Sequence, residues 1–307
     1  MENLSKKVSR ARKLIPFIVL LFGVAGVSTG SIFVRLADAH PFVKSAYRVT
    51  IASLVFLPFA LAFNRNEFRN LKPRDFALTV LSGAFLAFHF ATWISSLDYT
   101  TVASSVILVD TIPIWIALIN LLLGKGRPSR TMWLCIFMSV AGASIIGFGD
   151  LSFSGDALFG DALALIGGVM AAAYIYCGGE ARNKLGLAPY AVLCYGSCSV
   201  IMWGVVFIMG LDAAGFTADT WIAILGMGIL SQVVGHSSYN WALRYFSTGF
   251  VSIALLGEPI GSAILAYFLF DEYPAGFKLA GFALVIASIV MSGRAEERKK
   301  ITNAADE

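Results

Sequence analysis

The sequence predicts an all-α membrane protein with ten transmembrane helices, arranged as two inverted five-helix repeats. Three observations lead to this fold class. Hydrophobic residues make up 58% of the 307 residues and charged residues only 14%, whereas roughly a quarter of a soluble domain is charged. Apolar runs of about 20 residues, the length that spans a bilayer, recur along the chain. The second half of the chain also repeats features of the first half in register.

Five apolar runs are expected in the first half. The first follows a basic segment, but it is as long as a bilayer span and longer than the core of a secretory signal, so we expect a retained helix. The predicted spans are 14–34, 43–63, 76–97, 102–123 and 131–149. The charged residues that follow them, in the same order, are Arg35, Arg65, Asp98, Lys125 and Asp150.

Five further runs are expected in the second half, again bounded by charge, proline and glycine clusters. The predicted spans are 158–179, 189–210, 219–243, 248–270 and 275–293. The charged residues that follow them are Arg182, Asp212, Arg244, Asp271 and Arg294. Spans of this length and number predict a multi-pass protein embedded in a lipid bilayer.

Basic residues gather in the two tails and in the even-numbered connections, while the other connections are short and mostly acidic. Basic residues near span ends are retained on the cytoplasmic side of a membrane. We therefore expect a bacterial inner-membrane protein whose tails, 1–13 and 294–307, are both cytoplasmic. The net charge of +4 follows from this topology, so it does not indicate a nucleic-acid partner.

The two halves align when Pro259 is placed on Pro113. The same shift pairs Leu243 with Leu97, Tyr245 with Tyr99, Ala263 with Ala117, Pro274 with Pro128, Ala287 with Ala141 and Gly293 with Gly147. Because each half holds five spans, an odd number, the second copy must enter the membrane from the opposite face. We expect a first repeat over 14–149, a non-cytoplasmic linker over 150–157 and a second repeat over 158–293. Two such repeats can exchange packings and open a central site to either side.

Two carboxylic acids lie deep in the fourth and ninth spans, Asp110 and Glu258. A charged residue at a span centre costs about 2.5 to 3.5 kcal/mol on insertion scales, so it should face a cavity or a partner. Both acids lie just before the aligned prolines, Pro113 and Pro259. We predict that both acids bind substrate, and that a carboxylate at this depth can also carry a coupling proton.

The prolines themselves allow two interpretations. A proline has no N–H, so it frees the carbonyl four residues earlier, here those of Val109 and Leu255. A freed carbonyl beside a carboxylate makes a polar point for a substrate amine or a proton. The alternative is that the prolines only kink the two spans for packing.

Two polar and aromatic segments accompany the acids, one in the third span and one in the eighth. A polar stripe in a bilayer must face inward, so it either lines a substrate cavity or packs between helices. As substrate-binding candidates these segments supply His89, Trp93, His236, Tyr239 and Asn240.

Arg48 is the last candidate. It lies only a couple of turns into the second span, so it either reaches the nearby surface with its long side chain, or pairs with an acid or binds a substrate carboxylate. We expect no metal and no cofactor, because the four cysteines lie in apolar runs without paired spacing or nearby histidines.

Three segments resemble a known family, namely AYRVTIASLVFLP, GHSSYNWALRYFSTGFVSIALLGEP and LLGEPIGSAILAYFLFDEYP. They are similar to the drug/metabolite transporter superfamily, in its bacterial form with two tandem EamA-type repeats, over about Leu14 to Gly293. The resemblance implies a ten-helix inverted repeat, cytoplasmic termini, a cavity lined by both halves, and export of amino acids or related metabolites. Glu258 matches the family pattern. An acid that closes the fourth span of each repeat is matched by Glu272, but the first half has Gly126 there.

Secondary transport of a small polar metabolite by alternating access is the expected function, with export as the expected direction. An intramembrane enzyme and a non-transporting receptor or assembly subunit are the alternatives. The sequence contains no Walker motif, HExxH motif or nucleophile elbow, so we expect neither ATP-driven transport nor catalysis. The expected partners are a small-molecule substrate and a coupling proton, with the protein present as a monomer or weak homodimer. Substrate identity, direction and coupling stay open at this level.

Overall fold

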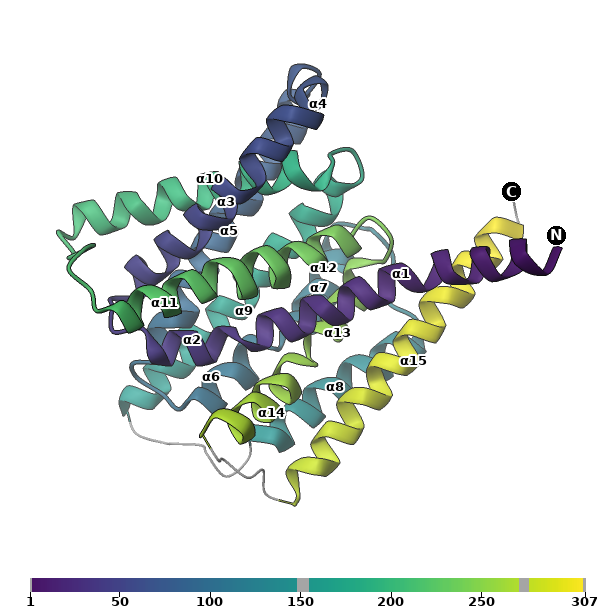
Figure 1. Cartoon of the computed structure of the whole chain (residues 1–307). Coiled ribbons are helices and arrows are strands. Elements are labelled where there is room, and N and C mark those ends of the chain that lie inside the picture. Colours follow the sequence, from purple (N-terminus) through teal and green to yellow (C-terminus); the bar gives the residue numbers. More distant parts are fainter. Residues whose placement is uncertain (1, 148–154, 271–275, 306–307) are drawn as a thin grey trace.

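The computed structural model describes residues 2–147, 155–270 and 276–305, and every regular element within these ranges is a helix (Figure 1). Nine helical stretches in the described ranges are long and apolar enough to cross a membrane. A shorter apolar helix occupies the place of the predicted fifth span, whose last residues lie outside the described ranges. The predicted all-α membrane fold is therefore confirmed, with nine rather than ten described spans of full length.

The helices follow one another in the order α1 (Glu2–Ser28), α2 (Gly30–Leu36), α3 (Pro41–Phe63), α4 (Arg65–Arg69), α5 (Pro73–Ser96), α6 (Val102–Val109), α7 (Ile112–Leu122), α8 (Arg130–Gly147), α9 (Gly155–Arg182), α10 (Leu187–Ile208), α11 (Ala218–Gly226), a π-helical segment (Met227–His236), α12 (Ser237–Ala242), α13 (Thr248–Leu255), α14 (Glu258–Phe270) and α15 (Lys278–Ala305).

Some predictions fall on residues without a described structure. The linker predicted over 150–157 is described only from Gly155, where α9 already begins. Asp150, Asp271, Glu272 and Pro274 all lie outside the described residues. For Gly126, which departs from the family pattern, the structure supplies a reason: its φ of 102° lies in the left-handed region that residues with a side chain rarely adopt.

The fourth and ninth spans are broken rather than kinked. The fourth span consists of α6 and α7, which are separated at Asp110 and Thr111, and the ninth consists of α13 and α14, which are separated at Leu256 and Gly257. Pro113 lies in the first turn of α7, where the missing N–H costs no helical hydrogen bond. The alternative that the prolines only kink two continuous spans is therefore wrong, because each proline lies in the first turn of a new half-helix.

The two broken spans also begin alike. The side chain of Thr101 accepts a hydrogen bond from the N–H of Ser104 (3.1 Å) at the start of α6. Ser247, the residue that aligns with Thr101 in the repeat, accepts one from the N–H of Phe250 (3.3 Å) at the start of α13. Such N-caps satisfy otherwise free backbone donors and fix where a helix begins.

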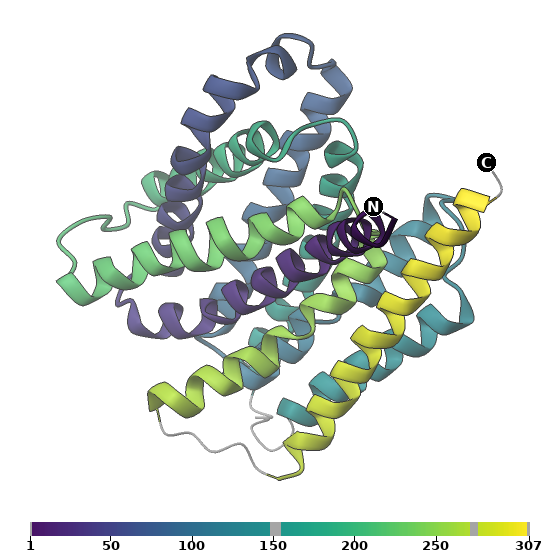
Figure 2. The same cartoon turned by 45° about the vertical axis from the view of Figure 1, so that its right-hand side comes forward.

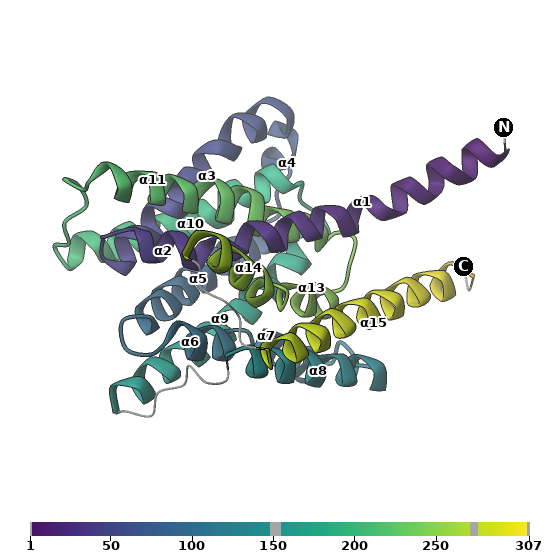
Figure 3. The same ribbon diagram turned by 60° about the horizontal axis from the view of Figure 1, so that its bottom comes forward.

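Helices at corresponding positions in the two repeats make corresponding contacts. α5 packs against α9, and the equivalent pair in the other repeat, the π-helical segment and α1, also packs together. α3 packs against its counterpart α10, and α8 against its counterpart α15. Figures 2 and 3 show α15, in yellow, running alongside α8 at one side of the bundle. The contact pattern is therefore that of two repeats related by a pseudo-two-fold axis.

The start of α1 and the end of α15 lie at the same end of the bundle (Figures 1 and 3). The main core extends over α1, α3, α5, α9 and α10 and includes residues of the broken spans in α6, α7 and α13. Close helix contacts depend on glycine at several points. A Cβ on Gly168 of α9, for example, would lie 2.8 Å from the carbonyl oxygen of Val109 at the end of α6.

Candidate functional site

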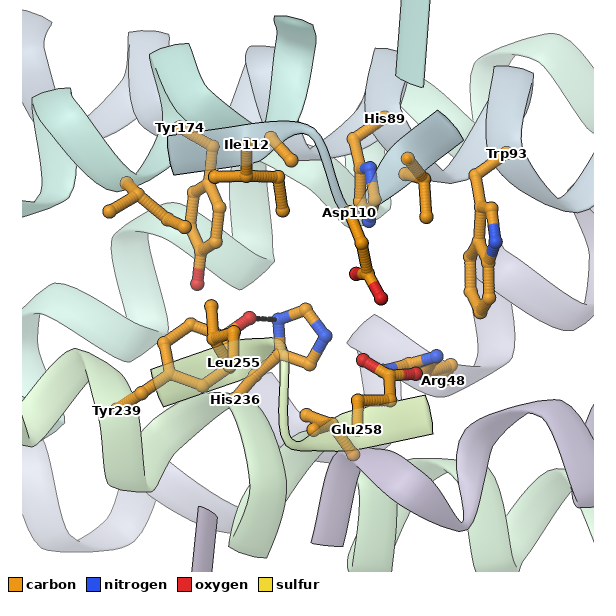
Figure 4. A pocket seen from close by; sticks show the side chains of 14 residues that line it. Arg48, His89, Trp93, Asp110, Ile112, Tyr174, His236, Tyr239, Leu255 and Glu258 are labelled. Atoms are coloured by element: carbon orange, nitrogen blue, oxygen red, sulfur yellow. Dashed lines mark hydrogen bonds between the residues drawn. The ribbon is translucent and has the colours of Figure 1, made fainter. Parts of the chain in front are cut away.

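A small cavity lies where the broken spans meet (Figure 4). Its volume is about 40 Å³. The two halves of the chain contribute equally to its wall, which is formed by Val27, Arg48, His89, Trp93, Val109, Asp110 and Ile112 from the first half and by Ala171, Tyr174, Ile175, His236, Tyr239, Leu255 and Glu258 from the second. This arrangement is the one that an inverted repeat produces at its interface.

The two acids lie at the breaks between half-helices. Asp110 directly follows the last residue of α6, and Glu258 is the first residue of α14. In Figure 4 their carboxyl groups approach each other from opposite sides of the cavity. Asp110 is only 4% exposed, and its Oδ2 has no hydrogen-bond partner. Val109 and Leu255, which lie four residues before the two prolines, also line the cavity.

Arg48 enters the cavity from α3 beside Glu258 (Figure 4). Its side chain is 2% exposed, so it does not extend to the membrane surface, and this alternative from the sequence is wrong. Its Nε donates to Oε1 of Gln232 at 2.6 Å, and its Cζ lies 4.4 Å above the ring of Phe90. Its Nη1 is left without a hydrogen-bond partner. A fixed positive charge therefore faces the cavity with free donor capacity.

His89 and Trp93 form one end of the cavity from α5. Their rings are stacked, with centroids 5.8 Å apart and planes 2° from parallel. Nδ1 of His89 lies 3.0 Å from the carbonyl oxygen of Gly167, which can only accept, so Nδ1 is the protonated nitrogen. Nε2 is then an acceptor in the neutral ring. The indole Nε1 of Trp93 has no partner.

The opposite end is formed by His236, Tyr239 and Tyr174. The phenol of Tyr239 is hydrogen-bonded to Nδ1 of His236, and the ring of His236 packs edge-on against Phe90 with centroids 5.4 Å apart. Tyr174 extends from α9, and its hydroxyl oxygen accepts from Nδ2 of Asn240 at 2.6 Å. This end of the cavity therefore has aromatic walls in which the two tyrosine hydroxyls and Nδ1 of His236 are already hydrogen-bonded.

Asn240 lies behind the wall rather than in it. It is fully buried, and its Nδ2 donates to the hydroxyl groups of both Tyr174 and Tyr195. Tyr195 pairs in turn with Ser237 at 3.0 Å. Asn240 thus orients a cavity residue from outside the cavity. The other seven substrate-binding candidates from the sequence, Arg48, His89, Trp93, Asp110, His236, Tyr239 and Glu258, all line it.

Two contributors were underrated by sequence reasoning. Tyr174 has a hydroxyl group in an apolar span, a weak signal because tyrosines often anchor helices at the membrane interface. Gln232 belongs to the polar stretch of the eighth span, but its pairing with Arg48 joins residues 184 positions apart. The π-helical turn that holds Gln232 is a type of helix irregularity often found at functional sites.

A family model for the EamA-like transporter family matches this chain twice, over residues 14–148 and 158–294. The chain belongs to that family. The resemblance seen in the sequence is thereby confirmed, including its two tandem repeats.

Curated relatives of this EamA-family protein carry names of the same kind. An uncharacterized transporter of Archaeoglobus fulgidus is 24% identical over 266 residues, which cover 85% of this chain and 91% of the relative. The uncharacterized transporter YdfC of Bacillus subtilis is 23% identical over 276 residues, covering 88% of this chain and 87% of the relative. A solved crystal structure shares the fold with a TM-score of 0.77 at 16% identity, covering 92% of this chain and 98% of the other.

The size of the cavity limits what this conformation of the EamA-family transporter can hold. A water molecule needs about 10 to 15 Å³ of probe-occupied volume, so about 40 Å³ admits only a few waters. A metabolite therefore requires the surrounding helices to move apart. Among the described residues no cluster of three or more His, Cys, Asp or Glu side chains is placed to hold a metal ion.

Proposed function

We propose that this EamA-family transporter exports a small polar metabolite that carries an amine, an amino acid or a related compound, across the inner membrane by alternating access and in exchange for a proton. The observation that supports the proposal best is that Asp110, Glu258 and the cation Arg48 line one cavity inside the bundle. The substrate-binding residues are Arg48, His89, Trp93, Asp110, His236, Tyr239 and Glu258, with Asn240 acting through Tyr174.

The formal charges of Arg48, Asp110 and Glu258 do not cancel when all three side chains are ionised. Arg48 interacts electrostatically with Glu258, and Glu258 with Asp110. Two ionised carboxylates and one guanidinium leave one negative charge in excess, and a buried charge without a partner is costly. Either a proton or the ammonium group of a substrate can neutralise the excess. Because the two neutralise the same charge, they compete, and competition between proton and substrate is the basis of exchange.

The repeat architecture suggests how the site reaches both sides. Four half-helices, α6, α7, α13 and α14, end or begin at the cavity. Half-helix ends present partial charges to a substrate, and one repeat can rock against the other about a fixed site. We infer that the repeats extend over 14–149 and 158–293, that a linker over 150–157 joins them, and that both tails are cytoplasmic. A monomer or weak homodimer suffices for this cycle.

The test is transport by purified protein in liposomes. Candidate amines and amino acids are first screened by thermal shift, since a ligand that binds the folded state raises its apparent stability. Counterflow of the unchanged solute, accelerated by an opposing proton gradient, is the expected result. Mass spectrometry of the solute separates transport from catalysis. Stabilising ligands that never cross the membrane would contradict the proposal in favour of a receptor, and an altered solute would do so in favour of an enzyme.

A further inference from the structure

A second, larger cavity of about 530 Å³ opens at the end of the bundle that carries the basic α7–α8 turn. It lies between α7, α8, α13 and α15. α13 contacts the other three helices, and α8 contacts α15; the four lie together in Figure 1. Its wall includes polar side chains from α7, from the turn, from the start of α13 and from α15, namely Asn120, Lys125, Arg127, Ser247, Thr248 and Glu296. We call this cavity the vestibule.

Only a short barrier separates the vestibule from the central cavity. Ile112 lines the central cavity and Ile116 lines the vestibule, and both belong to α7. Four residues of α-helix correspond to about 6 Å, or one turn. Across from them, α13 contributes Gly249 to the vestibule and Leu255 to the central cavity. The two cavities therefore lie next to each other along the α7–α13 contact, with the buried side chains of Ile112 and Ile116 on the two sides of their boundary.

A different groove, of about 380 Å³, does not suit a polar solute. It lies between α1, α13, α14 and α15 and is lined by apolar residues and glycines, with Ser28 as its only polar side chain. The hydroxyl of Ser28 is already bonded to the carbonyl oxygens of Val24 (2.8 Å) and Glu258 (3.2 Å). A polar solute would lose its hydration there without replacement.

On one side of the vestibule, the C-terminal helix α15 is hydrogen-bonded to the start of α13. Glu296 is 7% exposed, although it lies beyond the predicted end of the last span. Its Oε1 accepts from the backbone N–H of Ser247 at 2.7 Å, and its Oε2 accepts from the hydroxyl of Ser247 at 2.8 Å. Ser247 is the N-cap of α13, so the carboxylate sits at the positive end of that half-helix.

We propose that the vestibule is the passage through which substrate moves between the basic end of the bundle and the central cavity, and that the Glu296–Ser247 contact is a latch that holds α13 in the closed position. This inference rests on the proposed transport function. The latch acts on the half-helix whose other end brings Leu255 to the central cavity, next to Glu258. Release of Ser247 frees α13 to tilt away from α7 and to open the barrier between Ile112 and Ile116.

Cysteine labelling tests the passage. The four native cysteines are buried and free, so they are first replaced by alanine. Asn120→Cys places a thiol in the vestibule, and Asn70→Cys, in the exposed turn after α4, is the matched control. A bulky membrane-impermeant thiol reagent should react with both variants, block counterflow in Asn120→Cys and leave counterflow in Asn70→Cys unchanged.

The labelling itself is measured by mass spectrometry and does not depend on transport. An Asn120→Cys thiol that stays unreactive, or one that is fully modified without loss of counterflow, overturns the passage while the transport function stands. A reactive vestibule in a parent protein that moves no candidate solute counts instead against the proposed function.

A pair of adjacent glutamates tests the latch. Glu296→Gln removes the charge and one acceptor at Ser247, and Glu297→Gln makes the same change on an exposed side chain. The reporter is an Ile112→Cys thiol, which lies on the central-cavity side of the barrier. In that background Glu296→Gln should raise the labelling rate several-fold, and Ser247→Ala should raise it as well. Glu297→Gln should leave the rate unchanged. Equal rates for Glu296→Gln and Glu297→Gln in folded protein overturn the latch.

Discussion

At the scale of single residues, several buried polar atoms at the centre of this transporter have no hydrogen-bond partner. Arg48, Trp93 and Asp110 line the same cavity, and Nη1 of Arg48, Nε1 of Trp93 and Oδ2 of Asp110 have no hydrogen-bond partner. Leaving a buried donor or acceptor unsatisfied costs about 1 to 3 kcal/mol per group. A site that tolerates three such groups is prepared to gain from a ligand that satisfies them.

Glu258→Gln should insert and fold normally but lose most transport, by about tenfold or more, because an amide of the same shape can neither carry a proton nor neutralise an ammonium group. Initial uptake into liposomes at equal protein density measures the effect. Thermal unfolding of the variant should match that of the parent. Flux at the parental rate would remove Glu258 from the mechanism.

Gln232 should affect the affinity for substrate because it holds the side chain of Arg48 in position. Removing a hydrogen bond to a charged group costs about 1.5 to 3 kcal/mol, so Gln232→Leu should raise the KM for transport by about tenfold or more and change the maximal rate less. Gln232→Glu keeps an oxygen acceptor for Nε of Arg48 and should restore most of the affinity. If both variants raise KM equally, the role of Gln232 is packing, and Arg48 is oriented by other contacts.

At the scale of elements, the main feature of the site is that the fourth and ninth spans are interrupted, at Asp110 and at Gly257. Each break ends one half-helix and begins another beside the cavity, and each second half starts with a proline in its first turn. The segments around the breaks pack closely on their neighbours. α1 lies so near the π-helical segment that a Cβ on Gly26 would be 2.7 Å from the backbone nitrogen of Gly235.

Gly26→Ala should lower the thermal unfolding temperature in detergent, because α1 must move away from the backbone of Gly235. Gly204→Ala, on α10, is the matched control, since a Cβ there meets no atom within 4 Å. Alanine is favoured over glycine in a helix by about 1 kcal/mol, so the control should be neutral or slightly more stable. Equal destabilisation of both variants would show that the α1 contact does not limit stability.

At the scale of the whole molecule, most contacts between helices are reproduced when the two repeats are exchanged. The pairs α5–α9 and α1–π-helical segment are images of each other, and α3–α10 and α8–α15 each join two counterparts. Two states of similar free energy are expected of such a design, because each repeat can adopt the packing of the other. The small central cavity and the larger vestibule describe one of these states.

Topology gives a direct test at this scale. A thiol at Asn70 should be labelled by an impermeant maleimide only from the cytoplasmic side, and a thiol at Asp212, exposed after α10, only from the opposite side. Right-side-out and inside-out vesicles, which expose opposite faces, provide the comparison. Labelling of both positions from the same side would exclude the proposed alternation of connections and with it the inverted repeat.

The amino-acid sequence by itself determined that the chain lies in a lipid bilayer rather than in water. It also predicted the approximate spans, the repeat and most of the residues around the cavity. Hydropathy and proline spacing carry this information because the cost of placing a residue in lipid is a property of that residue and its close neighbours. Asp110 and Glu258 were found in this way.

Only the tertiary structure decided what each polar side chain contacts. It broke the fourth and ninth spans instead of bending them, buried Arg48 against Gln232, moved Asn240 behind the wall and joined Glu296 to Ser247. The physical reason is that a hydrogen bond between distant helices depends on their mutual rotation and depth. Those quantities follow from the packing of the whole bundle, which no local pattern of hydropathy or charge records.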